Sequence, residues 1–369
     1  MGKFLENAWY VGAWADEVGG APLGRTLLDQ PIVFYRRADG TPVAMHDRCP
    51  HRFVKLSGGA VQGDEIMCPY HGLTFNSAGR CTHARANDIA RDQFVLRTYP
   101  LVERYQALFI WMGDPALADP ALIPEFPFFA ESGRMIAGKG LTYLKANYLL
   151  EIDNLLDLSH LDFVHARTIS NGCVTEGQYD VYQRGTTVHS DWFIPATKAP
   201  VQFADLINLS KSSAWDGIKQ DMIVDHWLDM RWNAPGTLHL DVGVAPAGTQ
   251  RANPIDMAQA HFVTPETETT THYFWIYSMT DCGQGQDLLD VFLKVVHIAF
   301  DEEDRPMLEA QQLAMKSADF WADQPMILSE DAGAIRARRV LDKLIRDETR
   351  GVRAPGESAF ELLDLADAQ

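Results

Sequence analysis

Apolar and polar residues alternate in short runs over the first part of the chain. The runs at 32–35, 42–45 and 108–111 are rich in apolar and aromatic residues, as strands are. Glycine, proline and aspartate separate such runs and indicate turns. The pattern predicts a small antiparallel β domain over residues 1–115, followed by a proline-rich linker over 116–140.

The remainder of the chain mixes helical and strand-like periods. Apolar residues recur at helical spacing over 147–165, 288–315 and 331–346, with Pro306 expected to interrupt the second helix. We therefore expect an α+β fold, in which residues 141–369 form a curved antiparallel sheet with helices packed against it. The strand-like runs lie at 238–244, 261–264 and 272–277.

Composition narrows the classes of partner. The hydrophobic content is 46% and the net charge is −18, which argues against a nucleic-acid partner because phosphate binding needs clustered lysine and arginine. No apolar run approaches the ~20 residues of a membrane span. The N-terminus lacks a signal-peptide core, and five cysteines do not form an extracellular disulfide framework. We expect a cytoplasmic protein without a membrane partner.

Two short motifs in the N-terminal region carry the clearest chemistry. Cys49-Pro-His51 and Cys68-Pro-Tyr-His71 are separated by 16 residues. In a Rieske [2Fe–2S] centre two thiolates hold one iron and two imidazoles hold the other. Each of two loops must then supply one cysteine and one histidine, and these motifs do so. The spacing predicts a Rieske cluster.

Two other interpretations of these four residues stay open from spacing alone. Zinc also binds two cysteines with two histidines, although zinc fingers usually pair cysteine with cysteine and histidine with histidine. A disulfide between Cys49 and Cys68 would leave both histidines without a role. The Rieske interpretation is favoured because it employs all four residues and requires one cysteine and one histidine in each loop.

A second metal site is indicated in the segment 154–165. Asn154, Asp157 and His160 follow one another at i, i+3 spacing on one face of the predicted helix. His165 comes five residues after His160, which rotates it by roughly 140° on a regular helix. Both imidazoles therefore reach one metal only if the helix ends or bulges between them, as helices do at functional sites.

Two histidines need a carboxylate to complete the facial triad of a non-haem iron(II) oxygenase. Four acids at 301–304 are candidates, and spacing does not choose among them. Asp304 also suits the N-cap of a helix that begins near Pro306.

The chain resembles the Rieske non-haem iron oxygenases, and within them the vanillate O-demethylase and dicamba monooxygenase group. The resemblance implies that His160, His165 and Asp304 bind the mononuclear Fe(II), with Pro306 departing from the expected pattern and leaving Asp301 or Glu303 as alternatives. It is carried by Cys49-Pro-His51, Cys68-Pro-Tyr-His71-Gly72, Asn154-Leu-Leu-Asp157-Leu-Ser-His160-Leu-Asp-Phe-Val-His165, Thr264-Pro-Glu-Thr-Glu268, and Glu303-Asp304 ahead of Glu309-Ala310.

The resemblance also implies roles for three more residues. In relatives the carboxylate matching Asp157 joins a Rieske histidine of one subunit to an iron-binding histidine of the next, here His71 to His160, in a head-to-tail homotrimer. Asn154 is expected beside the iron, with an internal helix hydrogen bond as the alternative. His261 matches a position that faces substrate in relatives, and a core histidine is the competing interpretation.

We therefore expect the oxygenase component of a two-component monooxygenase, with O2 as co-substrate. Electrons would come from a separate NAD(P)H-dependent reductase of the flavin/iron–sulfur type, because the chain shows no glycine-rich dinucleotide motif. The resemblance favours O-demethylation of a methoxylated aromatic acid such as vanillate, to a phenol and formaldehyde. The alternatives are hydroxylation of an aromatic ring or aryl methyl group, N-demethylation, and, from a different class, a Rieske electron carrier without oxygenase chemistry.

Overall fold

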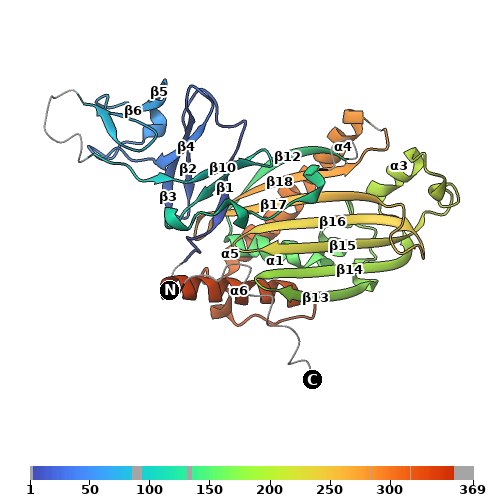
Figure 1. Ribbon diagram of the computed structural model, residues 1–369. Coiled ribbons are helices and arrows are strands. Elements are labelled where there is room, and N and C mark those ends of the chain that lie inside the picture. Colours follow the sequence, from blue (N-terminus) through green and yellow to red (C-terminus); the bar gives the residue numbers. More distant parts are fainter. Residues whose placement is uncertain (1–2, 85–93, 131–134, 284, 316, 353–369) are drawn as a thin grey trace. The chain divides into compact units, whose positions relative to one another are not determined.

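The computed structural model describes residues 3–84, 94–130, 135–283, 285–315 and 317–352 (Figure 1). The chain divides into two compact units. One comprises Glu6–Ile123 together with Thr264–Glu268, and the other includes Pro124–Val263 and most of the C-terminal third. No helix among the described residues is both long and apolar enough to cross a membrane.

The smaller unit consists of short antiparallel strands in three sheets, as the alternating runs predicted. Their orders are β1-β11-β10, β2-β3-β4-β9 and β5-β6-β7-β8. The strands are β1 (Trp9–Trp14), β2 (Leu23–Leu27), β3 (Gln30–Arg36), β4 (Pro42–His46), β5 (Ala60–Gln62), β6 (Glu65–Met67), β7 (Thr74–Phe75), β8 (Cys81–His83), β9 (Thr98–Tyr99), β10 (Leu101–Arg104) and β11 (Ala107–Trp111). The two Cys-His motifs lie in the loops after β4 and after β6, where strand ends leave their side chains free to converge.

The larger unit is built on a seven-stranded antiparallel sheet in the order β12-β18-β17-β16-β15-β14-β13. Together the two units confirm the predicted α+β fold. β12 begins inside the range predicted as a linker, and its unit starts at Pro124. The strands are β12 (Met135–Leu144), β13 (Gln178–Arg184), β14 (Thr187–Lys198), β15 (Ile223–Asn233), β16 (Thr237–Pro246), β17 (Ile255–Thr267) and β18 (Thr270–Thr280).

Helices cover one face of this sheet, as Figure 1 shows for α1, α5 and α6. The helices are α1 (Tyr148–Leu156), α2 (Leu161–Val164), α3 (Val201–Leu209), α4 (Gly285–Ile298), α5 (Arg305–Ala314) and α6 (Ala332–Thr349). α6, which matches the helix predicted over 331–346, buries Ala334, Ala337 and Leu341 at helical spacing. Its buried Arg338 donates two hydrogen bonds to Asp153 on α1, at 2.9 and 2.6 Å, and so fixes the helix that leads into the metal site.

The helix predicted over 147–165 is not continuous, and that prediction is wrong. α1 ends at Leu156, because Asp157 leaves the helical region with φ −110° and ψ 84°. The Asp157 side chain then accepts a hydrogen bond from the Ser159 backbone N–H, at 3.1 Å, and caps a 3-10 turn over Leu158–His160. His160 and His165 consequently flank the single turn of α2.

The helix predicted over 288–315 is interrupted, but not at the expected place. Pro306 is the second residue of α5, which follows the preceding helical residues without a break. The irregular part precedes it, as a π-helix over Ala299–Asp304. The wider π turn changes the direction in which the last residues of the segment face, and Asp304 is the final one.

Candidate metal centres

The two Cys-His loops of the smaller unit have the same backbone design. The Phe53 N–H donates to the Cys49 carbonyl and the Gly72 N–H donates to the Cys68 carbonyl, at 2.9 and 3.1 Å. Phe53 and Gly72 both have positive φ, 64° and 73°, which is rare for a residue such as phenylalanine. The paired turns place one cysteine and one histidine of each loop at a common point, where the His51 and His71 ring centroids are 4.6 Å apart.

The side chains at this point fit a cluster with thiolate and imidazole ligands. Cys49 and Cys68 are free thiols and each is 2% exposed. Burial raises the pKa of the Cys49 thiol, so a bound metal is needed to hold it as a thiolate. Among the described residues, the buried Nδ1 of His71 has no hydrogen-bond partner, as expected of an atom that binds a metal. No disulfide joins the two cysteines.

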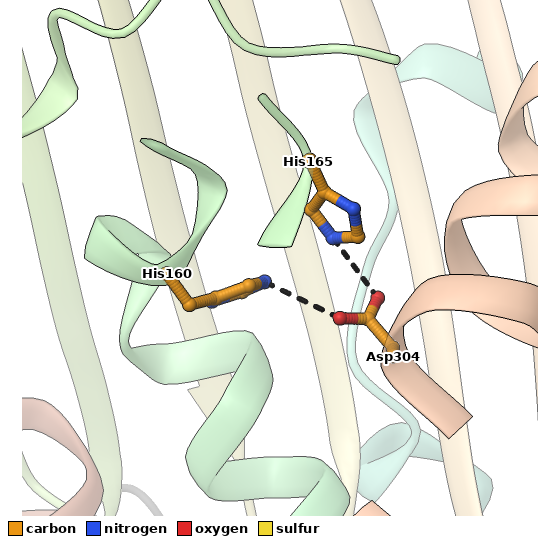
Figure 2. Close-up of side chains that lie close together, drawn as sticks. All are labelled: His160, His165 and Asp304. Atoms are coloured by element: carbon orange, nitrogen blue, oxygen red, sulfur yellow. Dashed lines mark ion pairs between the residues drawn. The ribbon is translucent and has the colours of Figure 1, made fainter. Parts of the chain in front are cut away.

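The second centre is formed by His160, His165 and Asp304 (Figure 2). One ligand atom from each lies within 4.8 Å of the others. The Nε2 atoms of His160 and His165 are 3.6 and 3.1 Å from the two carboxylate oxygens of Asp304. Two imidazoles and one carboxylate that converge from one side are the donor set of the facial triad of non-haem iron(II) enzymes. Such a triad leaves the other coordination positions of the metal open.

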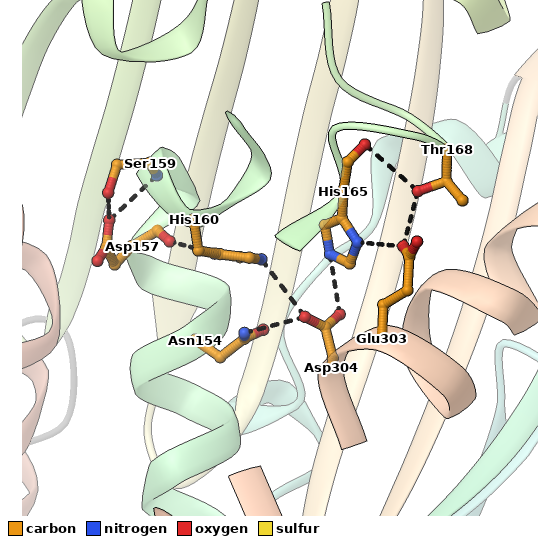
Figure 3. Close-up of polar contacts among 8 residues, drawn as sticks. All are labelled: Asn154, Asp157, Ser159, His160, His165, Thr168, Glu303 and Asp304. Carbon is orange, nitrogen blue, oxygen red and sulfur yellow. Dashed lines mark hydrogen bonds and ion pairs between the residues drawn. The ribbon is translucent and has the colours of Figure 1, made fainter. Parts of the chain in front are cut away.

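A layer of hydrogen bonds orients these three side chains (Figure 3). The Glu303 carboxylate lies 2.7 Å from the Nδ1 of His165 and also accepts a hydrogen bond from the Thr168 hydroxyl at 2.7 Å. The Asn154 amide donates to Asp304 at 3.2 Å rather than to its own helix. Such contacts fix the ring orientation of a metal-binding histidine and raise its basicity.

The other acids of the 301–304 run face elsewhere. Asp301 lies against the Thr142 hydroxyl, the His297 ring and the Arg305 guanidinium. Glu302 is exposed. The role of Glu303 as the partner of His165 was missed in the sequence, because nothing in its spacing links it to a histidine 138 residues earlier.

The contact between Asp157 and His160 is made by the backbone. The Nδ1 of His160 lies 2.5 Å from the main-chain carbonyl of Asp157, which therefore accepts the ring N–H. The Asp157 carboxylate binds the Ser159 hydroxyl and N–H through one oxygen. Among the described residues, its other oxygen accepts no hydrogen bond.

Burial and nearby charges shift the pKa values of His160 and His165 in opposite directions. Burial lowers the pKa of His160. For His165 burial also acts to lower the pKa, but hydrogen bonds and charges from Asp304 and Glu303 together raise it. Both rings must be neutral to bind a metal through Nε2, and the bound ion itself favours the deprotonated form.

The three side chains open onto a cavity between the sheet and the helices, and His261 lines it as well. His261 is 1% exposed and its Nδ1 lies 2.7 Å from the Tyr273 hydroxyl. Burial raises the pKa of Tyr273 well above its usual value, so the phenol keeps its proton, and the direction of its bond to Nδ1 follows the tautomer of His261. The Nε2 of His261 has no partner among the described residues and is available to a molecule in the cavity, as donor or acceptor according to the tautomer.

A β unit with a thiolate–imidazole site, followed by an α+β unit with a two-histidine, one-carboxylate site, defines a non-haem iron oxygenase with its own electron-transfer cluster. Comparisons with known proteins agree. Residues 8–100 match the Rieske [2Fe-2S] domain, and residues 144–347 match the vanillate O-demethylase oxygenase C-terminal domain. The chain belongs to the Rieske oxygenases of the vanillate O-demethylase type.

Full-length relatives support this assignment. The chain is 35% identical over 352 residues to the oxygenase component of chloroacetanilide N-alkylformylase from Rhizorhabdus wittichii, covering 94% of this chain and 97% of the relative. It is 34% identical over 343 residues to the oxygenase component of dicamba O-demethylase from Stenotrophomonas maltophilia, covering 92% and 98%. A crystal structure of dicamba monooxygenase bound to dicamba aligns with a TM-score of 0.83 at 34% identity, covering 94% and 99%.

The protein is therefore a monooxygenase that uses a Rieske [2Fe–2S] cluster, a non-haem iron and O2. Another similar crystal structure is that of dicamba monooxygenase with non-heme iron and dicamba. The alternative of an electron carrier without oxygenase chemistry is wrong, because a carrier does not need the second unit or its metal triad.

Proposed function

We propose that this chain is the oxygenase component of a two-component system that O-demethylates a methoxylated aromatic acid of the vanillate type. The observation that carries this is the His160, His165 and Asp304 triad at one end of a largely apolar cavity. An apolar cavity suits an aromatic ring, and the Nε2 of His261, which has no partner among the described residues, is available for a hydrogen bond to a polar group of the substrate. The dicamba and vanillate enzymes among the relatives are named for O-demethylation.

The residues divide the work as follows. Cys49, His51, Cys68 and His71 hold the cluster, and His160, His165 and Asp304 hold the iron. When bound, these groups supply two electrons and the site at which O2 is reduced. One oxygen atom enters a methyl C–H bond and the other leaves as water, which consumes two protons. The resulting hemiacetal collapses to a phenol and formaldehyde.

We infer that Asn154 and Glu303 position the iron ligands rather than bind the metal. The Asn154 amide holds one oxygen of Asp304, and Glu303 holds the Nδ1 of His165. His261 is assigned to substrate orientation, since its Nε2 has no partner in the described part of the chain.

We also propose a head-to-tail homotrimer in which the Asp157 carboxylate bridges His71 of one protomer and His160 of the next. One Asp157 carboxylate oxygen accepts no hydrogen bond among the described residues, and the main-chain carbonyl of the same residue holds the His160 ring; both support this role. Mixing Cys68→Ala protomers with His160→Ala protomers should restore activity in verified mixed trimers. No recovery there would show that electrons stay within one chain.

The remaining assignments concern organisation and setting. We propose the domain division 1–115, 116–140 and 141–369, which the matched ranges 8–100 and 144–347 support. We propose a cytoplasmic location, for which the five free cysteines are the supporting observation. The electron donor would be a separate NAD(P)H-dependent reductase of the flavin/iron–sulfur type.

The proposal is tested by aerobic turnover with a reductase and a panel of methoxybenzoates, with formaldehyde release as the readout. Formaldehyde in equal amount to the phenol is expected from at least one member. N-dealkylation is the second candidate, favoured by the N-alkylformylase among the relatives. A panel of N-alkyl anilides tests it, and dealkylation of anilides with no methoxybenzoate turnover would replace the first proposal by the second.

A further inference from the structure

The cavity that holds the metal triad continues far along the inner face of the sheet. On the sheet, Leu238 of β16 pairs with His261 of β17 on one side and with Trp232 of β15 on the other. His261 and Trp232 therefore lie at the same position along the strands. His226 also lines the cavity and lies six residues before Trp232 on β15. At about 3.3 Å per residue, the two histidines are separated by about 20 Å along the strands.

The helical wall gives a second measure of the same length. Asp304, at the metal end, and Phe292, on α4, both line the cavity. Twelve residues of helix separate them, which corresponds to about 18 Å at ~1.5 Å per residue, somewhat less through the π turn. A single benzoate ring with its methoxy group at the triad therefore does not reach the far end.

The far end presents a hydrogen-bond acceptor. The Nδ1 of His226 lies 2.8 Å from the Gly243 carbonyl, which only accepts, so Nδ1 carries the hydrogen and Nε2 carries a lone pair. His226 is 3% exposed, and burial lowers its pKa to about 4, so the ring is neutral. Among the described residues, Nε2 has no hydrogen-bond partner.

A second acceptor lies at the same end. Gln202, at the start of α3, also lines the cavity, and its Oε1 is buried without a partner in the described part of the chain. Between this end and the metal the walls are mostly apolar, as at Leu228, Val242 and Met257, with Gln259 as a polar residue midway along the sheet. None of the described lining residues is a lysine or arginine. A carboxylate at the far end would meet the His226 lone pair and no cation, so this end favours a neutral group.

We propose that His226 and Gln202 form a distal subsite that accepts a hydrogen bond from a hydroxyl or N–H group of an elongated aromatic substrate. The inference rests on the proposed function and names its substrate class more closely: an aryl methyl ether extended on the side away from the metal and ending in a donor. The metal site beside His261 at one end and the His226 lone pair at the other then fix which end of the substrate enters first.

The experiment compares two probes that differ only at the distal group. One is meta-methoxybenzoate carrying a para-hydroxyphenyl substituent, and the other carries an unsubstituted phenyl. Binding to the holoenzyme is measured by calorimetry without reductase, and KM and kcat are measured by formaldehyde release. One neutral hydrogen bond predicts that the hydroxyl probe binds about 3- to 10-fold more tightly, with a similar ratio in KM and little change in kcat.

The variant His226→Phe should abolish this preference, and His226→Gln, which restores an acceptor, should recover part of it. His239→Phe is the matched control: His239 is a half-buried, neutral histidine whose Nε2 is buried without a partner among the described residues, but it packs on Phe128 and does not line the cavity. It should keep the wild-type preference. Gln202→Leu, on the same cavity wall, should weaken the preference without replacing a core ring.

Several results would overturn the distal subsite. These are equal binding of the two probes, binding of neither, or His226→Phe and His239→Phe changing both probes to the same extent. The last pattern would mean that the far end is only an access route. A His226-dependent preference in calorimetry without formaldehyde release would support the subsite and count against O-demethylation, so the two proposals fail separately.

Discussion

The two metal centres of this molecule are built by different means. The cluster ligands lie on two loops between short strands, and each loop repeats the same turn, with Phe53 or Gly72 at positive φ. The iron ligands come from the two ends of the one-turn helix α2 and from the end of a π-helix. The first centre depends on local turns, whereas the second depends on how distant helices pack.

This difference has consequences for how each centre responds to change. Each cluster loop holds its own cysteine through backbone hydrogen bonds within five residues. The triad is held by side chains from several segments, such as Glu303 against His165 and Arg338 against Asp153. Single substitutions around the triad should therefore produce a graded series of effects, from loss of iron to small changes in its affinity.

The largest effect is expected from Asp304→Ala. Removal of the one carboxylate in the triad should abolish iron binding and lower turnover by more than about 100-fold, beyond the range for changes around a ligand. The cluster absorption should be unchanged, because its ligands lie in the other unit. Glu302→Gln removes an exposed acid from the same run and should retain full turnover. Equal loss in both variants would contradict the assignment.

Asp157→Asn should leave both metals bound and slow electron transfer between them. The substitution keeps the backbone carbonyl that holds His160 but removes the negative charge from the proposed bridge. We expect turnover to fall by about 10- to 100-fold, with unchanged iron content and cluster spectrum. Rapid-mixing measurement of cluster reoxidation is the check, and a wild-type rate would remove the bridging role.

Glu303→Gln should weaken iron binding without abolishing it. The neutral amide no longer polarises the His165 ring, and loss of such a partner reduces metal affinity by about 10- to 100-fold. Titration of the apoprotein with Fe(II) measures the effect, again with Glu302→Gln as the control. Complete loss of iron would instead make Glu303 a ligand in its own right.

Thr168→Val should give the smallest effect of the series. It removes one hydrogen bond to the Glu303 carboxylate at constant size, and bonds to a charged acceptor are worth about 1.5–3 kcal/mol. Iron affinity should fall by a few-fold. In the double variant Thr168→Val/Glu303→Gln, the threonine substitution should have little further effect, because both substitutions act through one contact. Additive losses would show that Thr168 acts independently of Glu303.

The sequence predicted the cluster site well because its ligands follow each other at fixed spacing within two turns. It also predicted the α+β fold and several strands, where alternation reflects burial on one face. The prediction failed where the backbone changes direction. Asp157 ends α1 by capping the next turn, and the π-helix that ends at Asp304 does not alter the spacing of apolar residues in the sequence.

Contacts between segments distant in sequence could not be predicted either. The pairing of Glu303 with His165, and the common cavity of His226 and His261, depend on sheet register and helix packing. Trp232 and Trp275 are buried core residues, at 0% and 4% exposure, and neither lines the cavity. Phe292 and Phe300 on the helical side line it instead.

Iron counting joined to cluster spectroscopy tests the two-centre account most directly. Wild-type protein should hold three irons per protomer at full occupancy, two in the cluster and one at the triad. His160→Ala should retain two with an unchanged cluster signal, and Cys68→Ser should retain only the triad iron. A wild-type iron content in His160→Ala with full turnover would contradict the account.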